Sequence, residues 1–162
     1  MHLTITENQK QTKRLAGELA KKLIQQKSEK ALVIALLGEL GSGKTTFVSG
    51  FSKALGINEK ILSPTFVLIH KHELQTGKRP AQHKGYRSLY HIDAYRLESE
   101  KDLLKLNIKK ILKDPKNIVM IEWADKVKGI VPKNAIWVYF KHSNTKKRSI
   151  TENKRDITVI PH

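Results

Sequence analysis

Hydrophobic residues follow two patterns along this chain. Residues 31–37 (ALVIALL) and 117–123 (NIVMIEW) are apolar runs of strand length, which is typical of strands covered on both faces. Residues 6–26 instead carry apolar side chains at helical spacing, and Thr6 and Gln9 are spaced as a capping box that would begin an amphipathic helix. The chain is therefore expected to combine buried strands with helices that have one apolar face.

The rest of the chain continues this alternation. Residues 44–56 predict a second helix, which Gly56 ends, and residues 99–112 have helical spacing as well. Further strands are predicted at residues 65–74, 87–95, 135–142 and 155–160. Strands that alternate with helices predict an α/β sheet with an antiparallel portion at its end. Because 162 residues suit one domain, we expect residues 1–162 to form a single unit.

The charge of the chain changes the range of partners to consider. Its 31 lysine and arginine residues outnumber 15 aspartate and glutamate residues, which gives a formal net charge of +16. A field of that sign attracts nucleotides, nucleic acids or acidic proteins. No cysteine is present, so the chain offers neither disulfides nor thiolate metal ligands. Residues 1–30 lack an uninterrupted apolar run, so we expect a cytoplasmic protein with no membrane partner.

The candidate chemistry lies directly after the first apolar run. Gly38, Gly43, Lys44 and Thr45 satisfy the pattern G-x-x-x-x-G-K-[ST] between a predicted strand and a predicted helix. Glycines at these positions let successive backbone N–H groups point into one concavity and hold phosphate oxygens. The Lys44 ammonium can reach the outer phosphates, and the Thr45 hydroxyl can bind a magnesium ion. The stretch predicts a site for ATP and Mg²⁺ on a three-layer, P-loop NTPase-like sheet with a mostly parallel core.

Two acidic residues are candidates for the metal side of this site. Glu122 ends a buried-type strand, and in a parallel sheet it would lie at the same edge as the phosphate-binding loop. Asp93 also follows a strand, where it could orient an attacking water or the metal shell. Other interpretations stay open at this point: Glu122 could simply meet solvent, and Asp93 could cap a helix.

Four short motifs in order make the chain similar to a known family. GELGSGKTTFVSGFSKALG, SPTF, HIDAYRL and IEW resemble the bacterial TsaE (YjeE) family, the P-loop ATPase of tRNA threonylcarbamoyladenosine biosynthesis. The resemblance extends from the first predicted helix to about Pro132. It implies an ATPase that acts on the TsaB and TsaD proteins, with tRNA reached through that complex. The segment at residues 72–86 is longer than the usual connection, and the chain after Ala135 has only a generic β pattern.

The resemblance also implies roles for individual residues. Thr45 and Glu122 would bind magnesium, and Lys44, Asp93 and Glu122 would be the catalytic residues. Ser63 and Thr65 of SPTF would lie in a switch-like segment near the γ-phosphate. The residues implied in nucleotide binding are Thr12, Glu39, Leu40, Gly41, Ser42, Gly43, Lys44, Thr45, Thr46 and Thr65.

Two other functions remain open from the sequence. A small P-loop kinase would need an arginine-bearing lid, and residues 74–87 contain Arg79 and Arg87. A basic RNA-binding protein could instead use ATP only as a structural ligand. The lysines between residues 101 and 116 fit either an RNA-facing patch or the solvated side of a helix.

Overall fold

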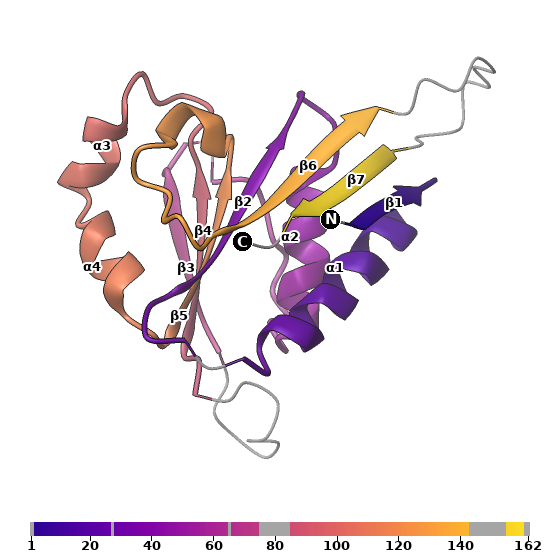
Figure 1. Ribbon diagram of the computed structural model, residues 1–162, viewed down its shortest axis with the longest axis horizontal. Coiled ribbons are helices and arrows are strands. Elements are labelled where there is room, and N and C mark those ends of the chain that lie inside the picture. The colour runs from indigo at the N-terminus through magenta and orange to yellow at the C-terminus, as the bar shows by residue number, and fades with distance from the viewer. Residues whose placement is uncertain (1, 27, 65, 75–84, 143–154, 161–162) are drawn as a thin grey trace.

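A computed structural model describes residues 2–26, 28–64, 66–74, 85–142 and 155–160. Seven strands form one sheet in the order β1-β7-β6-β2-β5-β4-β3 (Figure 1). The strands are β1 (His2–Thr6), β2 (Leu32–Gly38), β3 (Ile69–Glu73), β4 (Ser88–Asp93), β5 (Asn117–Glu122), β6 (Ile136–His142) and β7 (Arg155–Ile160). The helices are α1 (Gln9–Leu23), α2 (Lys44–Ala54), α3 (Glu100–Lys105) and α4 (Ile108–Lys113), with a 3₁₀ turn at Ala124–Val127.

The sheet has a parallel centre and antiparallel edges. Strand β2 pairs in parallel with β5 and β6, and β4 pairs in parallel with β5. Strand β3 runs antiparallel to β4, β7 to β6, and β1 to β7. This confirms the expected mostly parallel core with an antiparallel portion. Because β2, β4 and β5 point the same way, the loops that follow them meet at one edge of the sheet, where α/β folds bind ligands.

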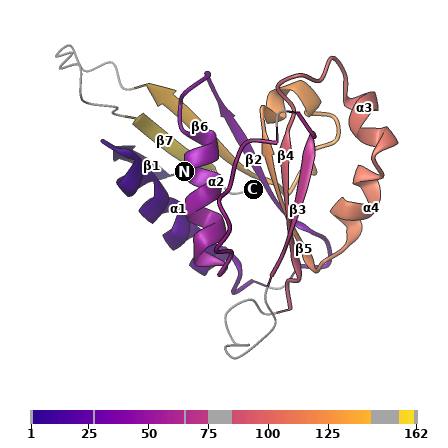
Figure 2. The ribbon, with the colours of Figure 1, turned by 180° about the vertical axis from the view of Figure 1, so that it is seen from behind.

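Helices cover both faces of the sheet. Helices α1 and α2 lie on one face and α3 and α4 on the other, as the two opposite views show (Figures 1 and 2). In β2, Ile34 and Leu36 pack in the core beneath α1 and α2, whereas Val33 and Ala35 pack in the core beneath α3 and α4. A strand buried on both faces reads as a continuous apolar run, which is why the pattern at residues 31–37 predicted β2.

The start of the chain differs from the prediction. Helix α1 begins at Gln9, and its cap is Asn8, whose side chain accepts a hydrogen bond from the Gln11 backbone N–H at 2.9 Å. Thr6, predicted as part of a capping box with Gln9, instead ends strand β1, where it pairs with Arg155. Asparagine caps helices at least as well as threonine, and the backbone of Thr6 is held extended by β7.

Two other elements are shorter than predicted. The strand expected at residues 65–74 begins at Ile69, because Leu68 adopts a left-handed φ of 64° after a turn closed onto Pro64. The helix expected at residues 99–112 is two short helices divided at Asn107, which has φ 56°. Asparagine tolerates this left-handed conformation better than most residues. Within the described ranges, none of the helices is long and apolar enough to cross a membrane.

Candidate functional site

The loop between β2 and α2 has the conformation that its glycines predict. Gly38 has φ 149°, and a Cβ there would lie 2.5 Å from the carbonyl oxygen of Phe140 on the neighbouring β6. Gly43 has φ 100° and precedes α2 with no side-chain cap. The first backbone N–H groups of α2 are therefore left for a ligand, and the positive end of the helix dipole favours an anion.

Lys44 folds back over this loop. Its Nζ donates hydrogen bonds to the carbonyl oxygens of Gly38 at 2.7 Å and Glu39 at 2.9 Å, and it lies 3.8 Å from the ring centroid of Trp123. Burial lowers the pKa of the Lys44 ammonium, and nearby carboxylates, Glu122 first among them, oppose that shift. An anion seated in the loop would meet a desolvated positive charge that can exchange carbonyl partners for phosphate oxygens.

Thr45 and Glu122 are in direct contact, although they are far apart in the sequence. The Thr45 hydroxyl lies 2.9 Å from Oε1 and 3.0 Å from Oε2 of Glu122. Glu122 is buried at the end of β5, and His91 Nε2 lies 2.8 Å from its Oε1. A hydroxyl and a carboxylate side by side are the hard oxygen donors that Mg²⁺ prefers, so these two residues fit that ion.

Asp93 lies beside Glu122, because the parallel register of β4 and β5 pairs the two residues directly. Its Oδ1 accepts a hydrogen bond from the Tyr95 backbone N–H at 2.9 Å, and its Oδ2 accepts one from the Ser63 hydroxyl. The contact with Tyr95 shows that Asp93 holds the turn after β4, while the contact with Ser63 joins it to the SPTF segment. Asp93 therefore links that segment to the edge of the sheet that carries the loop.

These residues share a cavity of about 440 Å³. Its lining residues are Gln9, Leu40, Gly41, Gly43, Lys44, Thr45, Thr46, Ser63, Asp93, Tyr95, Glu122, Trp123 and Arg155. Both catalytic acids expected from the sequence thus face the same space as the loop.

Three of the residues predicted to bind the nucleotide, Thr12, Glu39 and Ser42, are not among the residues that line the cavity. Thr12 is fully buried, and its hydroxyl is 2.9 Å from that of Thr6. Ser42 is buried, and Glu39 contributes its carbonyl to Lys44; neither lines the cavity. Thr65 lies outside the described residues.

The structure also brings in residues that sequence reasoning missed. His91 had a detectable signal, since it lies two residues before Asp93 on the same strand. Gln9 was assigned only to a helix cap, and Tyr95 only to the end of a strand. Arg155 had no signal at all, because nothing local connects the first residue of β7 with the loop.

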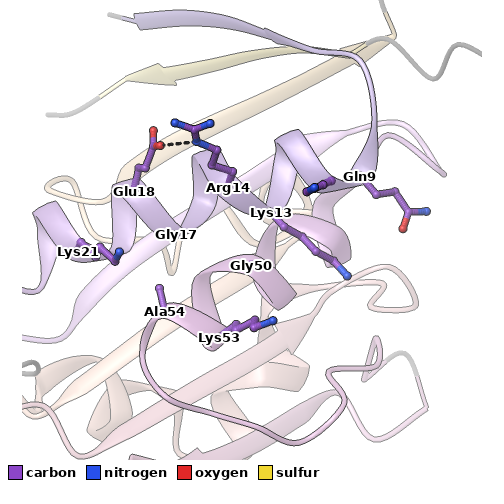
Figure 3. Close-up of a pocket in the computed structure, with 10 residues that line it drawn as sticks. Gln9, Lys13, Arg14, Gly17, Glu18, Lys21, Gly50, Lys53 and Ala54 are labelled. Carbon is purple, nitrogen blue, oxygen red and sulfur yellow. Dashed lines mark hydrogen bonds and ion pairs between the residues drawn. The ribbon is translucent and has the colours of Figure 1, made fainter. Parts of the chain in front are cut away.

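A larger and shallower hollow of about 760 Å³ runs between α1 and α2 (Figure 3). Its charged lining residues are Lys10, Lys13, Arg14, Glu18, Lys21 and Lys53, and Glu18 pairs with Arg14 at 2.9 Å. This basic groove has no carboxylate left for a metal ion among its described lining residues. The exposed lysines of α3 and α4 lie on the opposite side of the sheet (Figure 1).

The residues that flank the predicted kinase lid lie at the edge of the sheet opposite to the phosphate-binding loop. Residues 75–84, including Arg79, lie outside the described residues. Leu74 and Arg87 flank them, and the Leu74 N–H donates to the Arg87 carbonyl at 2.8 Å. That anchor is at the start of β4, whereas Asp93 is at its end, about 17 Å away for a six-residue strand. Arg87 therefore cannot cover the loop.

Comparisons with known proteins agree on one family. The protein-family model described as "Threonylcarbamoyl adenosine biosynthesis protein TsaE" matches residues 6–150 of this chain. A Rickettsia bellii protein described as "tRNA threonylcarbamoyladenosine biosynthesis protein TsaE" is 34% identical over 146 residues, which are 90% of this chain and 90% of that protein. The Bacillus subtilis protein of the same description is 33% identical over 119 residues, 74% of this chain and 67% of its own length.

A solved structure is similar in fold. The crystal structure of Bacillus subtilis YdiB superposes with a TM-score of 0.70 at 24% sequence identity, and the match covers 98% of this chain and 83% of that one. This similarity extends over both the parallel centre and the antiparallel edges of the sheet.

Proposed function

Because the chain belongs to the TsaE family of tRNA threonylcarbamoyladenosine biosynthesis, we propose that it binds ATP with Mg²⁺ in the 440 Å³ cavity and hydrolyses it for the tRNA-modification machinery. The family membership confirms the resemblance seen in the sequence. The observation that carries the proposal is the meeting of Lys44, Thr45 and Glu122 in that one cavity. The phosphate-binding loop, a hard-metal donor pair and a second acid are then all present.

The loop and Lys44 would bind the phosphates. The first residues of α2, Lys44 to Thr46, line the cavity, and the Lys44 ammonium is held by two carbonyl oxygens of the loop. Phosphate oxygens carry more charge than those carbonyls, so the ammonium gains by moving onto them. The ring of Trp123 shields this charge from water on one side.

Thr45 and Glu122 would hold Mg²⁺, which supplies charge neutralisation and polarisation of the phosphoryl oxygens when bound. In this structure the Thr45 hydroxyl donates to the carboxylate of Glu122, and it would turn its oxygen toward the ion instead. His91 fixes the position of that carboxylate from behind, as partners of metal ligands commonly do.

Asp93 would orient the attacking water, because it lies beside Glu122 and faces the cavity. The Ser63 hydroxyl donates a hydrogen bond to the Asp93 carboxylate. A terminal phosphate that changes the position of Asp93 would therefore also move the SPTF segment. Phe66, the last residue of SPTF, and Val67 after it are exposed. A partner protein that contacts them would sense a change in the position of this segment. TsaB and TsaD are the proposed partners, tRNA is reached through them, and the proposed compartment is the cytoplasm.

Hydrolysis of γ-labelled ATP tests this function directly. The purified chain with Mg²⁺ is expected to release label as inorganic phosphate, slowly alone and faster with a TsaB–TsaD pair. Transfer of label to a nucleoside or metabolite would instead indicate a kinase. RNA binding that is strong, sensitive to salt and unchanged in Lys44→Ala, without any phosphate release, would support the RNA-binding alternative.

A further inference from the structure

Arg155 is brought to the phosphate-binding loop by sheet pairing alone. As the first residue of β7, it pairs with His142 at the end of β6 and with Thr6 at the end of β1. Strand β6 is the neighbour of β2, so this end of β7 lies at the edge where β2 enters the loop. The side chain reaches Gly43: a Cβ on that glycine would lie 3.0 Å from Nε of Arg155.

Two of the three nitrogens of the Arg155 guanidinium are buried with no hydrogen-bond partner among the described residues. The residue is 5% exposed, and its Nε and Nη1 atoms make no hydrogen bond within the described part of the chain. Desolvation lowers the pKa of this group, yet a guanidinium stays charged at neutral pH. Buried guanidinium donors that lack partners destabilise a fold, which is tolerated where a ligand provides the missing partner.

The position of Arg155 indicates which part of a nucleotide it would contact. Glu122 and Asp93 enter the cavity from β5 and β4, on one side of β2, whereas Arg155 enters from β7 on the other side. A metal held by Glu122 would therefore lie on the opposite wall. Arg155 packs on Gly43, in the part of a phosphate-binding loop that cradles the inner phosphates, while the lysine reaches the outer ones.

We propose that Arg155 binds the diphosphate group that ATP and ADP share, on the side of the loop away from the metal. Its planar fork of donors matches two phosphate oxygens at once. Gln9, the first residue of α1, also lines the cavity and offers a polar amide there. The inference rests on the nucleotide-binding function proposed above and adds a second, fixed positive charge to the one supplied by Lys44.

The test compares Arg155→Met with wild type in calorimetric titrations of Mg-ADP and Mg-ATP. Loss of a charge-assisted bidentate contact is expected to weaken both nucleotides by about tenfold to a hundredfold, and by the same factor for each. Because methionine removes a buried charge that has two unpaired donors, the nucleotide-free variant is expected to melt about 2 to 4 °C higher than wild type. Lys141→Met, an exposed cation on β6, is the matched control and should change neither quantity.

The outcomes separate this inference from the proposed function. Wild type that binds neither nucleotide overturns both. Wild type that binds normally, with Arg155→Met equal in affinity and lower in melting temperature, shows a structural arginine and overturns the inference alone. A loss confined to ATP places the contact on the terminal phosphate and also overturns it. If Arg155→Met fails to fold, Arg155→Gln decides, because unchanged affinity in that neutral variant overturns the inference.

Discussion

Single residues in this site make several contacts at once. The Glu122 carboxylate accepts a hydrogen bond from the Thr45 hydroxyl and contacts His91 Nε2. The Asp93 carboxylate accepts hydrogen bonds from the Ser63 hydroxyl and the Tyr95 backbone N–H. Each acid is therefore held from two sides before any ligand arrives, which reduces the reorganisation that ligand binding requires. Removing one side chain is expected to change one step of the reaction more than the others.

Lys44→Ala is expected to weaken ATP binding by about tenfold or more and to abolish turnover. The change removes the ammonium that lies over the loop, and alanine leaves Gly38 and Glu39 carbonyls without their donor. Fluorescent-nucleotide titration and phosphate release measure the two effects. Lys53→Ala, an exposed lysine of the same helix, is the control. If Lys44→Ala hydrolyses ATP as fast as wild type, the ATP site is not at this loop.

Glu122→Gln and Asp93→Asn are expected to fail in different ways. Glu122→Gln should raise the Mg²⁺ concentration needed for half-maximal activity by about tenfold or more, because a metal-holding charge is lost. Asp93→Asn should leave ATP affinity nearly unchanged and lower kcat by about 10² to 10⁴, as expected for a residue that acts on the attacking water. Magnesium titrations and steady-state kinetics separate them, with Asp102→Asn on α3 as the control. Equal loss of ATP binding in both variants would contradict this division of roles.

The local sequence pointed to the residues of the loop and to the two acids, because each lies at the end of an apolar strand or within a few positions after it. It missed Arg155, since β7 follows a charged turn and carries only a generic alternating pattern. Its relevance depends on pairing between β6 and β7, a long-range fact that no local window contains. The role implied for Thr12 in nucleotide binding stays a prediction: its hydroxyl is hydrogen-bonded to that of Thr6 in this structure.

At the scale of elements, the sequence predicted six of the seven described strands and the first two helices, and it missed β1. Strands β2 and β5 are buried on both faces and therefore appear as apolar runs. Strand β1 is an edge strand with Leu3 and Ile5 exposed, so its pattern gives no signal of burial. Its only described neighbour in the sheet is β7, at the other end of the sequence.

The contact between α1 and α2 predicts an asymmetry between two glycines. A Cβ on Gly50 would lie 2.4 Å from the backbone oxygen of Lys13, whereas the nearest atom to a Cβ on Gly17 is Ala54 Cβ at 3.6 Å (Figure 3). Gly50→Ala is therefore expected to lower the free energy of unfolding by about 1 to 3 kcal/mol through overpacking. Gly17→Ala should raise it by about 0.5 to 1 kcal/mol, because alanine favours the helix.

Urea denaturation of both glycine variants gives the comparison. The two substitutions are chemically identical and lie on facing helices, so a general effect of alanine cancels. Equal free energies of unfolding in the two variants would show that α1 and α2 can move apart at Gly50 without loss of stability.

On the scale of the whole molecule, positive charge covers both sides of the sheet while the acids of the site gather at one edge. Basic side chains line the groove between α1 and α2, and exposed lysines lie on α3 and α4 (Figures 1 and 3). Exposed Leu62, Phe66 and Val67 lie around the SPTF segment near the site. A partner that touches this edge would meet an apolar segment whose position depends on Asp93 and Ser63.

The chain is expected to bind a TsaB–TsaD pair about tenfold more tightly with ATP than with ADP, and the pair should stimulate hydrolysis. In the proposed mechanism, a terminal phosphate would change the contacts of Asp93, and Ser63, which is hydrogen-bonded to Asp93, would transmit that change to the exposed residues beyond it. Titration of labelled chain with the pair in each nucleotide state measures the ratio. Ser63→Ala should reduce it, because the hydroxyl that joins the segment to Asp93 is lost. Equal affinities without stimulation would leave the proposed partnership without support.

The walls of the site come from opposite ends of the sequence. Gln9 is supplied by the first helix and Arg155 by the last strand, and both face the loop that begins α2. During synthesis on the ribosome, the loop and both acids emerge well before β7 does. A nascent chain can therefore form most of the parallel centre of the sheet while its pocket still lacks one wall. If Arg155 binds the nucleotide as proposed, a chain that ends before β7 is expected to bind its ligand more weakly than one that includes β7.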